Sequence, residues 1–152
     1  MAAGTWSVWP RAKHHLGLGN IDLSGGTFKA VLFQTGASAN LAGDVSTLAS
    51  IGSFTCTAGN GDEVATLAGL IWTGSVSASS ATRKWDCTNI VFTASTQAIS
   101  SVRYCVLYLS NGASAGTGIP VCYAALSTTA FAVGSGNTLT VQPATGGIFS
   151  LA

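Results

Sequence analysis

Two apolar stretches decide the fold of this chain: VRYCVLYL at residues 102–109 and IPVCYAAL at residues 119–126. Both are rich in the β-branched and aromatic side chains that favour extended strands. The segment that joins them, SNGASAGTG at residues 110–118, is rich in Gly and longer than a tight two-residue turn. We therefore predict that the two stretches pair as an antiparallel hairpin.

Side chains alternate between the two faces of a strand, so the sequence predicts which residues share a face. The first strand has one face with Val102, Tyr104, Val106 and Tyr108 and another with Arg103, Cys105, Leu107 and Leu109. In the second strand, Cys122 lies on the same face as Ala124 and Leu126. If the strands pair as a hairpin, Cys105 and Cys122 face the same layer.

Further runs of the same kind predict an all-β fold. These runs lie at residues 27–33, 67–77, 84–92, 138–142 and 147–151. Short strands separated by Gly-, Ser- and Thr-rich turns are typical of a sandwich or barrel. We predict a single antiparallel β-sandwich that is jelly-roll-like.

The amino-terminal segment is expected to be helical. Pro10 suits the first turn of a helix, where its missing N–H costs nothing, and the predicted helix runs to about Leu16. Residues 35–53 read as a long loop with one turn around residues 44–49. The 152 residues match the size of one domain. We expect one domain over residues 1–152, with an arm or helix at 1–20 and the sandwich at 21–152.

Charge is scarce in this chain. Only 7% of the residues are charged, the formal net charge is +1, and 47% of the residues are hydrophobic. A soluble monomer usually carries a charged surface and a net charge away from zero. The composition therefore indicates a component of an assembly.

The same composition bears on partners and location. Clustered Lys and Arg would be needed to attract phosphate groups, and the chain has no such cluster, so nucleic acid is not an expected partner. No apolar run approaches the roughly 20 residues that cross a bilayer, and the amino terminus lacks a secretory signal pattern. We expect a protein made in the cytoplasm, without a membrane partner.

The sequence offers little catalytic chemistry. His14 and His15 are adjacent and have no third ligand nearby, so a metal site there is the weaker alternative to surface or interface side chains. Asp62 and Glu63 lie in a Gly-rich loop, where turn formation accounts for them. No nucleotide-binding or hydrolase motif is present. We predict that the chain is not an enzyme and that it has no cofactor and no metal.

The cysteines and tryptophans have structural and functional interpretations. The four cysteines form no CxxC pair and are expected to be small buried hydrophobes. A Cys105–Cys122 disulfide stays open as an alternative in an oxidising exterior. Trp72 and Trp85 are expected in the core.

Trp6 and Trp9 allow two interpretations. They either cap one end of the sandwich or anchor the chain in a neighbouring subunit, because Trp is enriched at interface hot spots. For the second case, the candidate assembly contact consists of Trp6, Trp9, Arg11, Lys13, His14 and His15. A chain that lacks the residues before Pro10 would then fold but would not assemble.

Several segments together resemble those of a known group of proteins. Trp9, Ala12-Lys13, LGLGNIDL at 16–23 and TFKAVL at 27–32 are similar in order and kind to small tailed-bacteriophage virion structural proteins. The similarity continues through TNIVF at 88–92, YCVLY at 104–108, IPVCYAA at 119–125, NTLTV at 137–141 and GIF at 147–149. The chain is poorer in Asp and richer in Cys and Ala than these proteins.

The resemblance implies a capsid decoration, or cement-like, β-sandwich protein of the virion. Such a protein is non-enzymatic, and it bridges and stabilises subunits of the major capsid protein. With this function we expect a homo-oligomer, either a dimer or a trimer, whose partners are the major capsid protein and other virion proteins. Two alternatives are a neck, tail or fibre-base virion component of the same fold and a carbohydrate-binding module. The last would need Trp72, Tyr104 or Tyr108 exposed in a row.

Overall fold

The structure, a computed structural model, describes residues 3–52, 55–56, 62–74, 83–110, 118–144 and 146–151. Its helical segments are α1 Pro10–Gly17, η1 Thr35–Ala37, α2 Ser38–Leu41 and η2 Leu48–Ile51. The strands of its first half are β1 Ser7–Val8, β2 Phe28–Gln34, β3 Val64–Thr66 and β4 Ile71–Gly74. The later strands are β5 Arg83–Asp86, β6 Ile90–Thr93, β7 Ile99–Leu109, β8 Ile119–Ala125, β9 Phe131–Val133, β10 Thr138–Val141 and β11 Phe149–Leu151.

The strands form three antiparallel sheets. The main sheet has six strands in the order β1-β8-β7-β2-β3, with β9 paired to β7. A two-stranded sheet joins β10 to β6, and a three-stranded sheet has the order β11-β5-β4. The prediction of an all-β, antiparallel, sandwich-like fold with a short amino-terminal helix is confirmed.

The predicted hairpin lies at the centre of the main sheet. Cys105 lies opposite Ala124, and Leu107 lies opposite Cys122 in the antiparallel register of β7 and β8. Cys105 and Cys122 therefore face the same layer, as predicted. Most of the connection, residues 111–117, lies outside the described residues.

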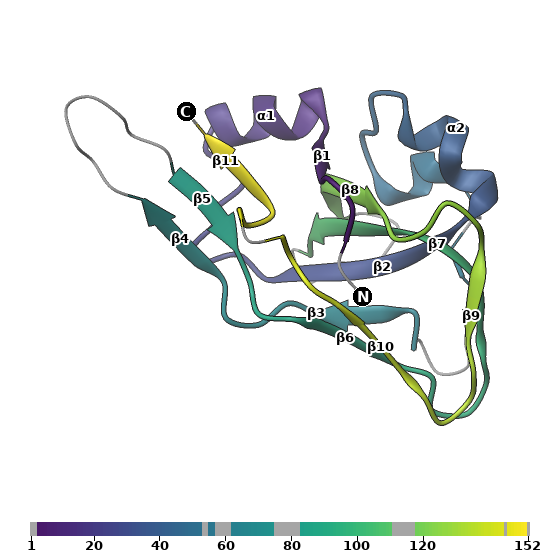
Figure 1. Cartoon of the computed structure of the whole chain (residues 1–152). Coiled ribbons are helices and arrows are strands. Elements are labelled where there is room, and N and C mark those ends of the chain that lie inside the picture. Colours follow the sequence, from purple (N-terminus) through teal and green to yellow (C-terminus); the bar gives the residue numbers. More distant parts are fainter. Residues whose placement is uncertain are drawn as a thin grey trace.

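The main sheet is buried on both faces. On one face, the Phe28 ring contacts Trp85 of β5 with 4.9 Å between ring centroids. On the other face, Tyr123 contacts Trp9, which directly precedes α1, at 5.0 Å. Figure 1 shows α1 and α2 on one side of β2, β7 and β8, and β6 and β10 on the other. This two-sided burial explains why β2 is apolar at five of its seven positions and why β7 is apolar throughout Tyr104 to Leu109.

Residues 84–92 differ from the single strand that was predicted. They form two strands, β5 and β6, that belong to different sheets. Between the strands, the Asp86 carboxylate accepts the Cys87 N–H, and the N–H and hydroxyl of Thr88 both donate to the Ala68 carbonyl. The Thr88 hydrogen bonds fix the connection to Ala68, where the chain leaves the three-stranded sheet after β5 and enters the two-stranded sheet with β6.

Residues 35–51 are more structured than the predicted loop. They contain η1, α2 and η2, and a capping box between Thr47 and Ser50 begins η2. Leu41, Leu48 and Ile51 from this segment are buried. The short strands β1, β3 and β9 were also not predicted, because two or three residues are too few to show alternation.

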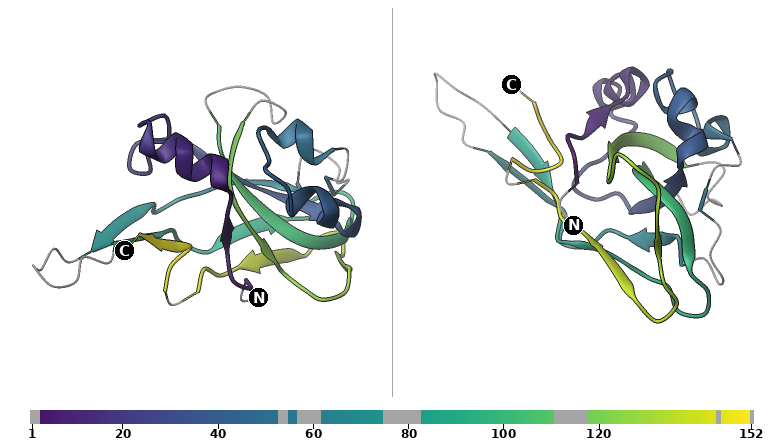
Figure 2. Two further views of the ribbon diagram at one scale, coloured as in Figure 1. Left: turned by 90° about the horizontal axis from the view of Figure 1, so that it is seen from above. Right: turned by 45° about the vertical axis from the view of Figure 1, so that its right-hand side comes forward.

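The three-stranded sheet extends to one side of the main sheet. Figure 1 shows β4 and β5 running away from the body of the molecule, with β11 beside β5, and Figure 2 shows the same arrangement from two other directions. Within the described part of the chain, no helix is long and apolar enough to cross a membrane.

Candidate functional site

A row of three aromatic side chains crosses the three-stranded sheet. In the registers of the two strand pairs, Trp85 of β5 lies opposite Trp72 of β4 and opposite Phe149 of β11. The ring centroids are 5.4 Å apart for Trp85 and Phe149, and 6.4 Å apart for Trp72 and Phe149. The three rings therefore share one face of the sheet.

This row is anchored at its centre and partly open at both sides. Trp85 is fully buried, and its indole Nε1 donates a hydrogen bond of 3.1 Å to the Leu23 carbonyl. Trp72 and Phe149 are only half-buried. The prediction of a core tryptophan is thus confirmed for Trp85, whereas Trp72 packs against the core without being enclosed by it.

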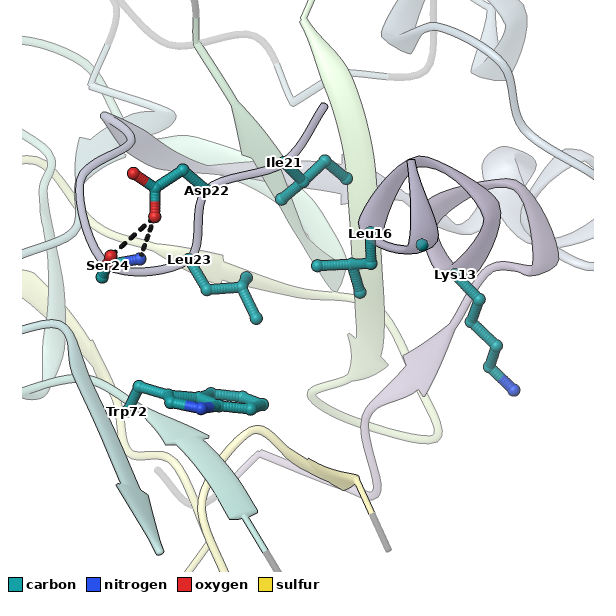
Figure 3. A pocket seen from close by; sticks show the side chains of 8 residues that line it. Lys13, Leu16, Ile21, Asp22, Leu23, Ser24 and Trp72 are labelled. Atoms are coloured by element: carbon teal, nitrogen blue, oxygen red, sulfur yellow. Dashed lines mark hydrogen bonds between the residues drawn. The ribbon is translucent and has the colours of Figure 1, made fainter. Parts of the chain in front are cut away.

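A groove lies on the open side of Trp72. It has a volume of about 570 Å³, and its apolar lining comes from Leu16, Ile21, Leu23 and Trp72. Leu16 belongs to α1, and Ile21 and Leu23 belong to the segment between α1 and β2. Figure 3 shows the Trp72 ring beneath Leu23, with Leu16 across the opening. The groove therefore joins the helix to the edge of the three-stranded sheet.

The segment after α1 gives the groove its shape. The Leu18 N–H bonds to the His14 carbonyl, and Gly19 follows with a φ of +74°, a backbone conformation that favours glycine. The Gly26 N–H then donates to the Asp22 carbonyl, which closes a turn before β2. The Gly-rich sequence LGLGNIDLSGG at residues 16–26 indicates a turn between α1 and β2, but nothing in it shows that this turn lines a groove with Trp72.

The groove lining contains one basic and one acidic side chain, Lys13 and Asp22. The Asp22 carboxylate accepts the N–H and the hydroxyl of Ser24 at 2.9 and 2.6 Å, and these hydrogen bonds lower its pKa. Lys13 is exposed and, among the described residues, makes no ion pair. The groove lining therefore carries one cation, Lys13, and one anion, Asp22, which stays ionised at neutral pH because the Ser24 hydrogen bonds lower its pKa.

A second cavity lies at the other side of the aromatic row, beside Phe149. It also has a volume of about 570 Å³ and lies between the residues around Trp6 and those around β11. The indole Nε1 of Trp6 is buried and has no hydrogen-bond partner among the described residues. The two edges of the three-stranded sheet therefore both border open space.

The structure places two of the predicted assembly residues inside the chain's own core. Trp6 and Trp9 are 7% and 2% exposed. Between them, β1 pairs with β8, and the Trp9 indole Nε1 donates to the Leu41 carbonyl at 3.0 Å. Burial of each side chain within its own protomer favours the interpretation in which these tryptophans cap the sandwich. Residues 3–9 belong to the fold, because Gly4, Ser7 and Val8 pair with β8.

The remaining predicted assembly residues lie on α1. Arg11, Lys13 and His14 are exposed, and His15 is half-buried with its Nδ1 3.3 Å from the Asn20 side-chain amide. Of these four residues, Lys13 alone lines the groove. His14 and His15 belong to no group of three potential metal ligands, and the described residues contain no such group.

All four cysteines are free thiols. Cys56, Cys105 and Cys122 are buried, as predicted, and Cys87 is half-buried. Burial raises the pKa of the Cys56 and Cys87 thiols to about 12, with a smaller contribution from a nearby carboxylate in each case. Burial also raises the pKa of Cys105 and Cys122.

The strand register does not favour the Cys105–Cys122 disulfide. The two residues are diagonal neighbours, since Cys105 lies opposite Ala124 and Cys122 lies opposite Leu107. Diagonal positions are about 7–8 Å apart, whereas a disulfide needs Cβ atoms within about 4.5 Å. A bridge would therefore require a shift in register.

The row of exposed aromatic residues needed for a carbohydrate platform is not formed. Tyr104 and Tyr108 are 8% and 2% exposed, and they lie on the face of the main sheet that also carries Tyr123. Trp72 is the one member of that predicted row with an open ring face.

Comparisons of the chain with protein-family models, with curated proteins and with solved structures found no match in any of the three.

Proposed function

We propose that this chain is a non-enzymatic structural protein of a phage virion, a capsid decoration protein that bridges neighbouring subunits of the major capsid protein. The observation that carries this proposal is the apolar groove with Lys13 at its rim, on a chain in which only 7% of the residues are charged. An open apolar surface with a polar rim is characteristic of protein interaction sites.

The arrangement of the fold supports a role in binding. The main sheet is closed on both faces and provides a rigid body, whereas the three-stranded sheet presents Trp72 beside the groove. A half-buried tryptophan in a pocket is a frequent energetic centre of an interface. Many copies on one lattice would add avidity to a modest contact at each site.

The state of the possible nucleophiles also supports a non-enzymatic role. Burial raises the pKa of all four thiols, and a thiol rather than a thiolate is a poor nucleophile at neutral pH. His14 and His15, which are the histidines of the chain, lie on α1 and outside the groove lining. In the groove lining, the Ser24 hydroxyl donates to the Asp22 carboxylate, and the same hydrogen bonds that lower the Asp22 pKa make this carboxylate a weak base for activating a hydroxyl.

The experiment is a binding assay on capsids. Purified chain is mixed with expanded capsids of the virus that encodes it, prepared without the chain, and bound protein is measured by sedimentation and cryo-electron microscopy. We expect saturable binding with density repeated over the outer lattice. Absence of binding would overturn the proposal, and density confined to one ring at a single vertex would indicate a neck or tail component.

Trp72 makes carbohydrate binding the second candidate, because an open tryptophan ring can stack on a sugar. A glycan array distinguishes the two functions. A glycan signal that disappears in Trp72→Ala, together with unaltered capsid binding by that variant, would favour the carbohydrate-binding module.

A further inference from the structure

β4 is an edge strand beside the groove. It pairs with β5 from Ile71 to Gly74, and no described strand pairs with its other side. Ile71, whose side chain lies on the sheet face opposite to Trp72, is 51% exposed, so that face of β4 is open to solvent beside the unpaired edge. An unpaired strand edge offers its N–H and C=O groups to an incoming extended segment.

The groove lies where side chains of such a segment would point. It is lined by Trp72 of β4, whereas the second cavity lies at β11, the opposite edge of the three-stranded sheet. In a strand added to β4, alternate side chains would face the Trp72 side of the sheet. The groove walls formed by Leu16, Ile21 and Leu23 are apolar, so they suit apolar side chains.

The charge at the rim specifies a further property of the segment. Lys13 is exposed at the groove and makes no ion pair among the described residues, because the carboxylate of Asp22, the acidic residue of the lining, is bonded to Ser24. The Asp44 carboxylate at the first turn of α1 accepts the Arg11 N–H and belongs to no groove wall. The Lys13 cation is therefore available to a carboxylate of an incoming chain.

We infer that the groove and the free edge of β4 together bind an extended segment of a partner protein, which pairs with β4, places apolar side chains against Trp72 and directs a carboxylate to Lys13. The identity of the partner rests on the proposed function, which makes it a segment of the major capsid protein. The chemistry of the segment follows from the groove itself.

The experiment uses short overlapping peptides that cover the sequence of the major capsid protein. Binding of each fluorescent peptide to the full chain is measured by anisotropy. We expect one region to bind, with apolar residues at alternate positions and an acidic residue among them. Two N-methylated versions of that peptide are compared, each methylated at one of the two alternating sets of backbone nitrogens. The version that lacks the N–H donors facing β4 should not bind, whereas the other should.

Two variants of the chain test the side-chain contacts. Trp72→Ala should weaken peptide binding at least about tenfold, as expected for the central residue of an interface. Lys13→Glu should weaken it by about threefold to tenfold, since an exposed ion pair is lost and a repulsion replaces it. Lys13 is exposed, so this variant tests the inference even if Trp72→Ala fails to fold.

Arg11→Glu is the matched control. It makes the same change in net charge on the same helix, but Arg11 does not line the groove and lies about 200° around the helix from Lys13. We expect its peptide affinity to stay within about twofold of the unmodified chain, because charges exposed to solvent are screened over short distances.

Several results would overturn the inference. These are equal losses of peptide affinity in Lys13→Glu and Arg11→Glu, unaltered peptide binding in Trp72→Ala, or no effect of backbone methylation at either set of alternate nitrogens.

The capsid assay separates the inference from the proposed function. If capsids bind the chain but no peptide does, and Lys13→Glu and Trp72→Ala bind capsids normally, the inference fails while the proposed function stands. If capsids do not bind, the proposed function fails, and peptides from the neck and tail proteins decide the inference, which falls if none of them binds.

Discussion

The six-stranded sheet is buried on both faces, whereas the three-stranded sheet is buried only around Trp85 at its centre. Phe28, Leu32 and Leu107 of the main sheet are 0–1% exposed, and helical segments or small sheets cover each face. In the three-stranded sheet, Trp72 and Phe149 remain half-buried, and a cavity lies beside each of them.

This difference separates stability from binding in the molecule. Side chains enclosed on all sides contribute most to the free energy of folding, because their removal exposes apolar surface and leaves cavities. Side chains that are enclosed on one side keep surface for a partner. We therefore expect substitutions in the main sheet to affect folding, and substitutions in the three-stranded sheet to affect binding more than folding.

Substitution of Phe28 by Ala should give the largest loss of stability. The ring is fully buried between the main sheet and Trp85, so its removal leaves a cavity between the layers. We expect a decrease of about 3–5 kcal/mol in the free energy of unfolding, measured by urea denaturation followed by tryptophan fluorescence. A decrease below about 1 kcal/mol would contradict the view that the layers are held together at this contact.

The paired variants Trp9→Ala and Trp72→Ala compare the same residue type in the two settings. Trp9 is enclosed, its ring contacts Tyr123, and its indole N–H donates to the Leu41 carbonyl, so its loss should cost about 3–5 kcal/mol. Trp72 is half-buried, and its loss should cost about 1 kcal/mol. Thermal unfolding by circular dichroism measures both variants. Equal losses would show that the two sheets are held equally firmly.

The all-β class and the central hairpin could be predicted because long alternating strands leave a clear pattern. Tyr104 to Leu107 pair with Cys122 to Ala125 in one register, and their two faces are those that alternation indicates. A β-bulge after Leu107, which alternation could not indicate, shifts Tyr108 and Leu109 to Pro120 and Ile119. The amino-terminal helix was also predictable from Pro10. These are local signals that a single sequence contains.

The groove depended on contacts between distant segments. Trp72 and Leu16 are far apart in the sequence, and nothing in either segment indicates that they line one cavity. The burial of Trp6 and Trp9 has the same origin, because it requires β1 to pair with β8, which follows more than a hundred residues later. Such pairings are set by the tertiary fold, so composition and spacing could not identify them.

Thiol reactivity should show which sheet opens first. Cys87 directly follows β5 of the three-stranded sheet, whereas Cys105 and Cys122 are fully buried in the main sheet. Burial raises the pKa of each thiol, so none should react rapidly with a disulfide reagent at neutral pH. In mild denaturant we expect Cys87 to react first, because a less enclosed region opens locally before the molecule unfolds.

Cys87→Ser identifies the early phase of that reaction, since the variant should lose it while the later phases remain. Mass spectrometry of the labelled protein assigns the other sites. Simultaneous reaction of Cys87, Cys105 and Cys122 at the rate of global unfolding would show that the three-stranded sheet does not open separately. The same samples, kept without reductant, should show no Cys105–Cys122 bridge.

The smallest expected effect concerns Asp62, which lies before β3 in the main sheet. Its carboxylate accepts the N–H and hydroxyl of Ser95, 33 residues away, and these hydrogen bonds lower its pKa below the usual value of 3.8. A carboxyl whose pKa is lower in the folded state stabilises the fold above the unfolded pKa, and this contribution disappears as pH falls through the folded value.

Asp62→Asn should therefore be slightly less stable than the unmodified chain at pH 7 and equal to it at low pH. Asp44→Asn, which removes the same charge at a carboxylate that accepts the Arg11 N–H at 3.3 Å, is the control, and urea denaturation from neutral to acidic pH gives the comparison. A difference for Asp62→Asn that persists unaltered at low pH would mean that the Ser95 contact stabilises the edge of the main sheet without depending on the carboxylate charge.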